Sequence, residues 1–428
     1  MNYETLKNYI RSDEIEDIIG EILCTKSRDE ILEEKERYLR LLDEAYALYG
    51  DGDYHFISSP GRTEIGGNHT DHQHGHVVAA SLNMDNLVVV KGNDDKIVRY
   101  RDGDFRIRPV DLNDLSIKEE EINTSESLIR GIAFRLNELG YRYGGFDALC
   151  ESRVLVGSGI SSSACFEVML VEIFNALYNE EIISPVERAK IGQFAENVYF
   201  GKPSGLLDQM AISVGGFVTI NFQKPENPDI ENFAFSFDDY GYDLILVNTK
   251  GDHSDLSYEY AAIPNEIKKV AKELGVEYLA DCSQAKFMDH YQEIREKIGN
   301  DRAMLRAMHF YNEDKRAIAQ REAIREGDID TLLRLMKKSG NSSYEYLQNV
   351  YSNSRVNSQS LSIGLALADQ YLDGDGAYRV HGGGFEGTIQ LVVPHEKTEG
   401  ISKLMCSVFG DDCLMKVKIR PFGTKTVI

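Results

Sequence analysis

A glycine-rich turn followed by hydroxyl side chains is the first candidate for chemistry in this chain. The segment reads Val154-Leu-Val-Gly-Ser-Gly-Ile-Ser-Ser-Ser-Ala164 and runs into an apolar helical pattern. Glycine lets the backbone approach an anion closely, and the N–H groups and dipole at a helix N-terminus attract negative oxygens. The segment therefore indicates phosphate binding, although a turn that merely caps a helix would look similar. It is neither a Walker motif nor a Rossmann fingerprint.

A second segment, residues 59–75, concentrates arginine, carboxylates, histidines and glycines in a stretch that we expect to be mostly loop. One interpretation is a metal site, because His69, His72, His74 and His76 lie close together in the sequence with Asp71. No cysteines join them, and His-rich runs are often only polar loops. Recognition of a sugar, for which several short polar side chains must converge on adjacent hydroxyls, explains this mixture of residues better.

The third segment, residues 196–210, places Glu196 on a predicted helix and Asp208 in the loop beyond it. Acidic residues at a helix end are usually solvated or capping. Asp208, however, lies in an apolar, glycine-bounded stretch. A carboxylate buried there near an arginine could accept a substrate proton or orient a hydroxyl.

The elements that must position these residues alternate between the two types of secondary structure. Apolar residues at three- and four-residue intervals predict a helix over 28–49, and Ser184 with Pro185 and Glu187 predicts the capped start of a helix over 184–200. Polar residues 226–243 suggest a domain boundary. Helical patterning is predicted over 262–350, and strands are predicted at 54–58, 87–90, 211–222, 244–247, 387–393 and 413–419. This mixture predicts an α+β protein.

Composition excludes several functional classes. A formal charge of −23 argues against a nucleic-acid partner, and no apolar run is long enough to cross a membrane. The scattered cysteines fit reduced thiols in a cytoplasm better than a disulfide framework. We expect a cytoplasmic monomer whose partners are small molecules.

Taken together and in this order, the segments resemble the GHMP kinases, and within them the galactokinases. The family's first motif is present as Gly61-Arg-Thr-Glu-Ile-Gly-Gly-Asn-His-Thr-Asp71, and its phosphate loop as Gly157-Ser-Gly-Ile-Ser-Ser-Ser-Ala164. A third motif is present as Val380-His-Gly-Gly-Gly-Phe-Glu-Gly387. The resemblance covers roughly residues 52–428. It implies a two-domain α+β fold with the active site between the domains, and transfer of a phosphoryl group from ATP, with Mg²⁺, to the C1 hydroxyl of galactose.

The resemblance also implies a division of the chain and a set of site residues. Residues 1–50 would be a helical extension, 51–228 the N-terminal domain with the sugar motif and the phosphate loop, and 229–428 the C-terminal domain. The implied catalytic pair is Arg62 and Asp208; the sugar contacts are Asn68, His69, Asp71, Asp208 and Tyr260; the ATP contacts are Gly157, Ser158, Gly159, Ser161, Ser162 and Ser163; the metal ligands are Ser163 and Glu196; and Gly382, Gly383 and Gly384 line the cleft.

Departures from the family pattern leave the sugar open. Galactokinases typically carry glutamate, facing the C6 hydroxyl of the sugar, where this chain has Asn68. A neutral amide would remove the repulsion that a carboxylate exerts on an acid at C6, so galacturonate becomes an alternative substrate, as does another hexose. A catalytically silent galactose sensor is a third hypothesis. Retention of Arg62, Asp208, Glu196 and Ser163 argues against it, because a pure binder does not need them.

Overall fold

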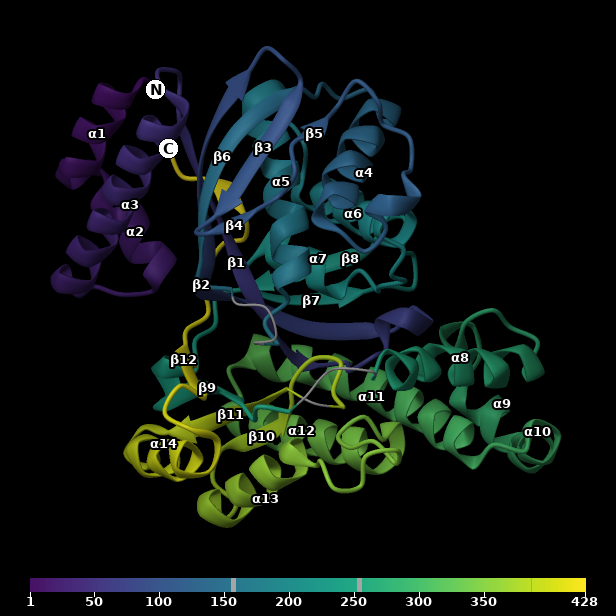
Figure 1. Ribbon diagram of the computed structural model, residues 1–428. Coiled ribbons are helices and arrows are strands. Elements are labelled where there is room, and N and C mark those ends of the chain that lie inside the picture. Colours follow the sequence, from purple (N-terminus) through teal and green to yellow (C-terminus); the bar gives the residue numbers. More distant parts are fainter. Residues whose placement is uncertain (155–158, 252–255, 386) are drawn as a thin grey trace.

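The computed structural model describes residues 1–154, 159–251, 256–385 and 387–428, which form two β-sheets with helices around them (Figure 1). The larger sheet contains β1 (His55–Gly66), β2 (His76–Asn93), β3 (Ile97–Asp102), β4 (Phe105–Arg106), β5 (Val110–Asp111), β6 (Gly145–Ser152), β7 (Phe217–Asn221), β8 (Asp229–Phe233) and β13 (Lys425–Thr426). The smaller sheet has the order β10 (Ala377–Val380), β11 (Thr388–Pro394), β9 (Tyr242–Asn248) and β12 (Leu414–Val417).

Helices cover both faces of the larger sheet (Figure 1). The N-terminal helices α1 (Tyr3–Arg11), α2 (Glu16–Leu23) and α3 (Arg28–Tyr49) lie on one face, and α4 (Ser125–Glu138), α5 (Ser162–Tyr178), α6 (Pro185–Phe194) and α7 (Leu207–Val214) lie on the other. Successive strand residues point to opposite faces. Leu87 and Val89 of β2 accordingly pack with α1 and α3, whereas Val88 and Val90 pack with α4 and α5.

The second half of the described chain is mainly helical around the smaller sheet (Figure 1). Its helices are α8 (Ser257–Glu273), α9 (Gln284–Asp289), α10 (Tyr291–Ile298), α11 (Asp301–Glu326), α12 (Ile329–Ser342), α13 (Ser360–Leu372) and α14 (His395–Phe409). One hydrophobic cluster joins the two sheets, with Val78 and Ala80 of β2 on one side and Leu244 and Leu246 of β9 on the other. The opposite face of β9 packs on α13 and α14 through Ile245 and Val247.

The chain passes between the sheets after β8, because β8 pairs with β7 in the larger sheet. The expected division between residues 228 and 229 therefore falls inside a β-hairpin. The C-terminus returns to the larger sheet, where Ile57 and Ser58 of β1 pair with β13. The backbone oxygens of Met1 and Ile428 accept hydrogen bonds from Tyr54 and Phe56, so the two termini lie close together (Figure 1).

The α+β prediction and most of the predicted elements are confirmed. The helix predicted over 28–49 coincides with α3. Ser184 caps α6 by accepting a hydrogen bond from the Glu187 N–H at 3.3 Å. The Glu187 carboxylate does not complete a capping box, because it accepts instead from the Tyr141 hydroxyl at 2.6 Å. Beyond Phe194 the helix changes to a π-helical turn, Ala195–Phe200.

Two predictions of local structure are wrong. Residues 59–75 are not mostly loop, since β1 continues to Gly66. Register shifts on either side of Arg62 let the strand carry Pro60 and Gly61 while it pairs with β2. The strand predicted over 211–222 is α7 followed by β7, because the apolar run spans a helix end, the Gly215-Gly216 turn and a strand. Among the described residues, no helix is long and apolar enough to cross a membrane.

Candidate active site

Arg62 and Asp208 form the centre of the candidate site. Arg62 lies on β1 between the two register shifts, and Asp208 lies in the first turn of α7. Arg62 Nε donates to Asp208 Oδ1 at 2.6 Å and Nη2 donates to Oδ2 at 2.9 Å, while Nη1 donates to the Gly159 carbonyl at 2.7 Å. The Ser161 hydroxyl also donates to Asp208 Oδ2. A bidentate pair of this kind fixes both the position and the plane of the carboxylate.

The charge state of Asp208 follows from two opposing effects. Burial alone would raise its pKa, but the charge and hydrogen bonds of Arg62, together with the Ser161 hydroxyl, outweigh burial and hold the pKa below its ordinary value. The Arg62 side chain is 7% exposed, whereas that of Asp208 is 34% exposed. Asp208 is thus an ionised, oriented carboxylate that solvent and ligands can reach.

The described part of the predicted phosphate loop lies against this pair. Ser161 is the N-terminal cap of α5, and Ser162 and Ser163 are the first two helical residues. No acidic residue lies in the first turn of α5, so the helix itself supplies no negative charge to its N–H groups and dipole. Gly159 contacts Arg62 as described above. Gly157 and Ser158 lie outside the described residues.

His69, Tyr260 and the glycine run meet beside Arg62, although they come from distant segments. The His69 ring centroid lies 5.3 Å from that of Tyr260, which is on α8. His69 Nε2 donates to the Gly383 carbonyl at 3.2 Å, and burial lowers the pKa of His69 to about 3, so the ring is neutral. A Cβ on Gly383 would lie 2.4 Å from Tyr260 Cε2, so only glycine permits this approach. Gly382 and Gly384 flank this contact.

Asp71 lies close to Gly205, in the segment before Asp208. It begins the short 3₁₀ turn Asp71–Gln73, and its Oδ2 lies 1.8 Å from the position that a Cβ on Gly205 would occupy. Gly205 is three residues before Asp208 in the chain. Asp71, a predicted sugar contact, therefore lies against the segment that leads into Asp208.

Asn68 is hydrogen-bonded on every side within the protein. Its side chain is 1% exposed, and Nδ2 donates to Glu64 Oε1 at 2.9 Å and to the Gly382 carbonyl at 2.9 Å. Its Oδ1 accepts from Ser343 and from Asn349, at 3.1 and 2.9 Å. The donors and acceptor of Asn68 are thus used within the protein. A sugar contact by Asn68 stays a prediction, and it would require one of these bonds to open.

Glu196 lies in the π-helical turn and is 2% exposed. Its Oε1 accepts from Lys202 Nζ and its Oε2 from Gln209 Nε2, both at 2.9 Å. Gln209 directly follows Asp208, so the expected metal ligand and the expected catalytic carboxylate are tied to the same turn of α7. The pairing of Glu196 with Ser163 as metal ligands stays a prediction.

Sequence analysis missed several side chains that surround these residues. Glu64, Asn349 and Arg379 hold the interior of the site, and Glu167, Lys202 and Gln209 hold Glu196. Glu167 had a usable signal, because it is an acidic residue in an otherwise apolar face of α5, one turn after Ser163. For Gln209 the only signal in the sequence is its position beside Asp208.

The histidines that might have shared a metal ion diverge. His74 stacks on Tyr278 with ring centroids 3.6 Å apart. His76 Nδ1 lies 2.8 Å from Asp314 Oδ1, on α11. Within the described ranges, these histidines therefore do not come together as a group that could hold a metal ion.

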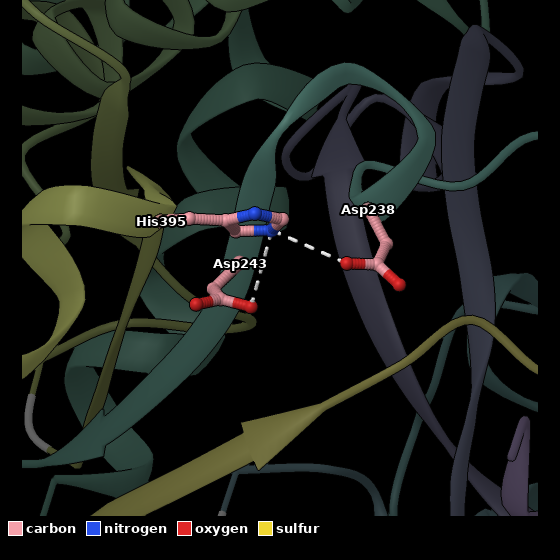
Figure 2. A group of neighbouring side chains, drawn as sticks. All are labelled: Asp238, Asp243 and His395. Carbon is pink, nitrogen blue, oxygen red and sulfur yellow. Dashed lines mark ion pairs between the residues drawn. The ribbon is translucent and has the colours of Figure 1, made fainter.

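One group of ligand-type side chains does meet, at the edge of the smaller sheet (Figure 2). His395 Nε2 lies 3.2 Å from Asp238 Oδ1 and 3.6 Å from Asp243 Oδ1. Lys416 Nζ already lies 2.9 Å from Asp243 Oδ1, and Thr398 donates to Oδ2. Because Lys416, Thr398 and His395 together pair with both oxygens of Asp243, we interpret this group as an ion-pair network between β9 and α14.

Comparison with known proteins places this arrangement among sugar and mevalonate kinases. The family described as "GHMP kinases N terminal domain" matches residues 127–216, and the family described as "Galactokinase galactose-binding signature" matches residues 46–92. The chain is 29% identical to a galactokinase of Lactobacillus helveticus over 82% of this chain and 89% of that protein. It is 26% identical to a galactokinase of Enterococcus faecalis over 87% of this chain and 94% of that protein.

Solved structures show the same fold. A galactokinase of Lactococcus lactis in complex with galactose superposes with a TM-score of 0.77 at 23% identity, over 90% of this chain and 98% of that one. A mevalonate kinase of Methanococcus jannaschii gives a TM-score of 0.60 at 16% identity, over 86% and 99% of the two chains.

Proposed function

The chain belongs to the GHMP kinase superfamily and carries its galactokinase signature, and from this premise we propose that it phosphorylates galactose at C1 with ATP as the donor. The observation that carries the proposal is the Arg62–Asp208 pair, because Arg62 belongs to the matched galactose-binding signature and Asp208 accepts a hydrogen bond from Ser161 at the N-terminus of α5. This is the arrangement that transfer of a phosphoryl group to a sugar hydroxyl requires, because the two substrates must meet at one carboxylate.

Asp208 is the group that handles the proton in this proposal. Its ionised carboxylate accepts the hydrogen bond of the C1 hydroxyl and takes its proton as the sugar oxygen forms a bond to the γ-phosphorus and the bond to the β-phosphate oxygen breaks, releasing ADP. Arg62 keeps the carboxylate ionised and aligned, and it adds positive charge beside the transferring group. Phosphoryl transfer depends mainly on such positioning and charge neutralisation.

The sugar is held by the polar groups around that carboxylate. His69, Asp71 and Tyr260 are proposed to contact its hydroxyls, with Gly382 to Gly384 as the adjoining wall. The neutral His69 ring offers an acceptor at Nδ1, because Nε2 donates to Gly383. Short polar side chains on several elements suit recognition of a rigid polyol.

Residues at the start of α5 are proposed to bind the triphosphate. The N-terminus of α5, with no acidic residue in its first turn, and the Ser161, Ser162 and Ser163 hydroxyls fit an anion. The carboxylate of Glu196 with the Ser163 hydroxyl fits Mg²⁺, which prefers oxygen ligands. Bound there, Mg²⁺ would neutralise charge on the β- and γ-phosphate oxygens. Gly157 and Ser158 remain predicted ATP contacts from sequence.

The alternative substrate, galacturonate, depends on a neutral Asn68 amide facing C6 in place of a carboxylate. Both donor directions of Asn68 are used by Glu64 and Gly382, and Glu64 would place a carboxyl group behind any acid bound there. This arrangement favours a neutral hexose over a uronate. The alternative of a silent sensor is disfavoured by the aligned Arg62–Asp208 pair, which sugar binding alone does not need.

An ADP-release assay with MgATP tests the proposal on a panel of galactose, galacturonate, glucose, N-acetylgalactosamine and arabinose. We expect turnover to favour galactose and to be lost in Asp208→Asn. Asp238→Asn, which removes an exposed aspartate far from the site, serves as the control. Preference for galacturonate would refute the assignment of the substrate, and calorimetric binding of galactose without turnover would refute the assignment of an enzyme.

A further inference from the structure

The two carboxylate oxygens of Glu196 accept hydrogen bonds from one half-exposed and one buried side chain. Oε1 accepts from Lys202 Nζ at 2.9 Å, and the Lys202 side chain is 51% exposed. Oε2 accepts from Gln209 Nε2 at 2.9 Å, and Gln209 is 1% exposed. One oxygen is therefore held by a buried amide, and the other by the ammonium group of a half-exposed lysine.

The same amide nitrogen of Gln209 also donates to a second carboxyl group. Its Nε2 lies 2.9 Å from Glu167 Oε2 and 2.9 Å from Glu196 Oε2. Only the amide nitrogen carries two N–H donors, so its position between two carboxyl groups fixes the orientation of the amide. Glu167 is 0% exposed. A polar residue at such depth is costly unless it is needed to hold its partners.

Two atoms of this cluster remain unused. Glu167 Oε1 and Gln209 Oε1 are buried and have no hydrogen-bond partner within the part of the chain that the structure describes. Glu167 thus makes its side-chain contact to Gln209 at the expense of an unpaired oxygen, which is a poor arrangement for stability alone. The free-energy cost of these unpaired oxygens is explained if Glu167 orients the Gln209 amide, which in turn orients the Glu196 carboxylate.

The cluster is also continuous with the rest of the proposed site. Glu167 is four residues after Ser163 on α5, so the two side chains lie on the same face of that helix. Gln209 is the residue after Asp208 on α7. A shift of the Gln209 amide would therefore disturb the proposed metal ligands and the catalytic carboxylate together.

We propose that Gln209 and Glu167 are positioning residues for the divalent cation, and that Lys202 competes with that cation for Glu196 Oε1. Glu167 locks the Gln209 amide, the amide fixes Glu196 Oε2, and Oε1 is thereby presented to the cation. The proposal rests on the proposed function, in which Glu196 is a ligand of Mg²⁺.

Binding of Mn²⁺ in the presence of ADP tests the proposal without turnover, with free Mn²⁺ measured by electron paramagnetic resonance. In Gln209→Leu we expect Mn²⁺ affinity to fall by about 10- to 100-fold, as is typical when a residue that orients a metal ligand is lost. In Glu167→Gln we expect Mn²⁺ affinity within about threefold of wild type, because the amide oxygen of the new side chain can still accept from the Gln209 amide. Glu167→Leu removes this acceptor and should lower Mn²⁺ affinity as far as Gln209→Leu.

Lys202→Met tests the other side of Glu196 with an exposed residue that cannot disturb the core. We expect Mn²⁺ to bind up to about fivefold more tightly, because a half-exposed ion pair is a weak competitor. Gln320→Leu is the control: Gln320 is equally buried and also has an unpaired Oε1, but its amide donates to the Ile65 carbonyl. This variant should leave Mn²⁺ affinity unchanged.

Several outcomes would overturn the positioning role. The first is a Mn²⁺ affinity within twofold of wild type in Gln209→Leu, and the second is an equal loss of Mn²⁺ affinity in Glu167→Gln and Glu167→Leu. The others are weaker Mn²⁺ binding in Lys202→Met and wild-type protein that adds no Mn²⁺ site to that of ADP. Should Gln209→Leu fail to fold, the Glu167→Gln and Lys202→Met results decide. Failure of the proposed function is separate, since it appears as absent sugar turnover in wild-type protein.

Discussion

Replacement of Arg62 by methionine should reveal how much the catalytic carboxylate depends on its partner. Two unit charges about 4 Å apart attract by ~4 kcal/mol at the effective dielectric near a protein surface and by ~1 kcal/mol in water. Because the Asp208 side chain is 34% exposed, an intermediate value of about 2 kcal/mol is appropriate, equivalent to about 30-fold in rate. We expect kcat to fall at least that far in Arg62→Met.

The pH dependence of the same variant has a definite sign. Arg62 and Ser161 hold the pKa of Asp208 below its ordinary value against the effect of burial, so the wild-type carboxylate stays ionised as the pH falls. Without Arg62 the pKa of Asp208 rises, and the acid limb of kcat against pH should move to higher pH. Stability from the pair is likewise present above the unfolded-state pKa of aspartate and is lost as the pH falls through the folded-state pKa.

Arg62→Lys separates charge from geometry. Lysine keeps the positive charge but cannot make the two parallel hydrogen bonds, so we expect a kcat between wild type and Arg62→Met with an acid limb close to that of wild type. The assay is ADP release from pH 4.5 to 9 at constant ionic strength, with the melting temperature of each variant as the control for folding. An unmoved acid limb and a loss of kcat below threefold in Arg62→Met would refute the reasoning.

Three further predictions concern residues that support the site. Glu313→Gln should destabilise the protein by about 3 kcal/mol in urea unfolding, because Glu313 is 0% exposed, has a pKa lowered from 4.5 to about 2 and accepts from the Gly67 N–H at 3.0 Å. The wild-type protein should lose this contribution to stability as the pH falls from about 4.5 to 2. Equal stability of variant and wild type would contradict this prediction. Gly383→Ala should weaken galactose binding by about 5- to 150-fold in calorimetry, since overpacking against Tyr260 costs about 1–3 kcal/mol; unchanged affinity would show that the contact yields. Ser184→Ala should cost about 1 kcal/mol of stability through loss of its cap and leave kcat unchanged; a change in kcat would contradict its purely structural role.

Patterns within a few residues of one another were sufficient to predict much of this protein. The helix over 28–49 and the Ser184 cap follow from side-chain spacing and hydrogen bonding within one or two turns, and the structure confirms both. The family motifs allowed Arg62 and Asp208 to be named as partners across 146 residues, and the structure pairs them. Their chemical roles, like those of the sugar contacts, stay predictions until activity is measured.

Local patterns were misleading where pairing of distant segments decides the structure. Pro60 and Gly61 are read as a loop from sequence alone, yet register shifts against β2 accommodate them within a strand. The run 211–222 is mostly apolar and carries no charged residue, so its pattern could not reveal that Gly215 and Gly216 separate a helix from a strand. Both outcomes depend on which neighbour supplies the hydrogen bonds.

The amino-acid sequence by itself determined the fold class, the kinase family and the list of candidate residues, because motifs and periodicity are properties of short segments. Only the tertiary structure decided what those residues contact. The buried Asn68 side chain donates hydrogen bonds to Glu64 and Gly382, and the Gln209 amide donates to Glu167 and Glu196. The physical reason is that the partner of a buried polar group is chosen by packing among segments far apart in the chain, which no local pattern records.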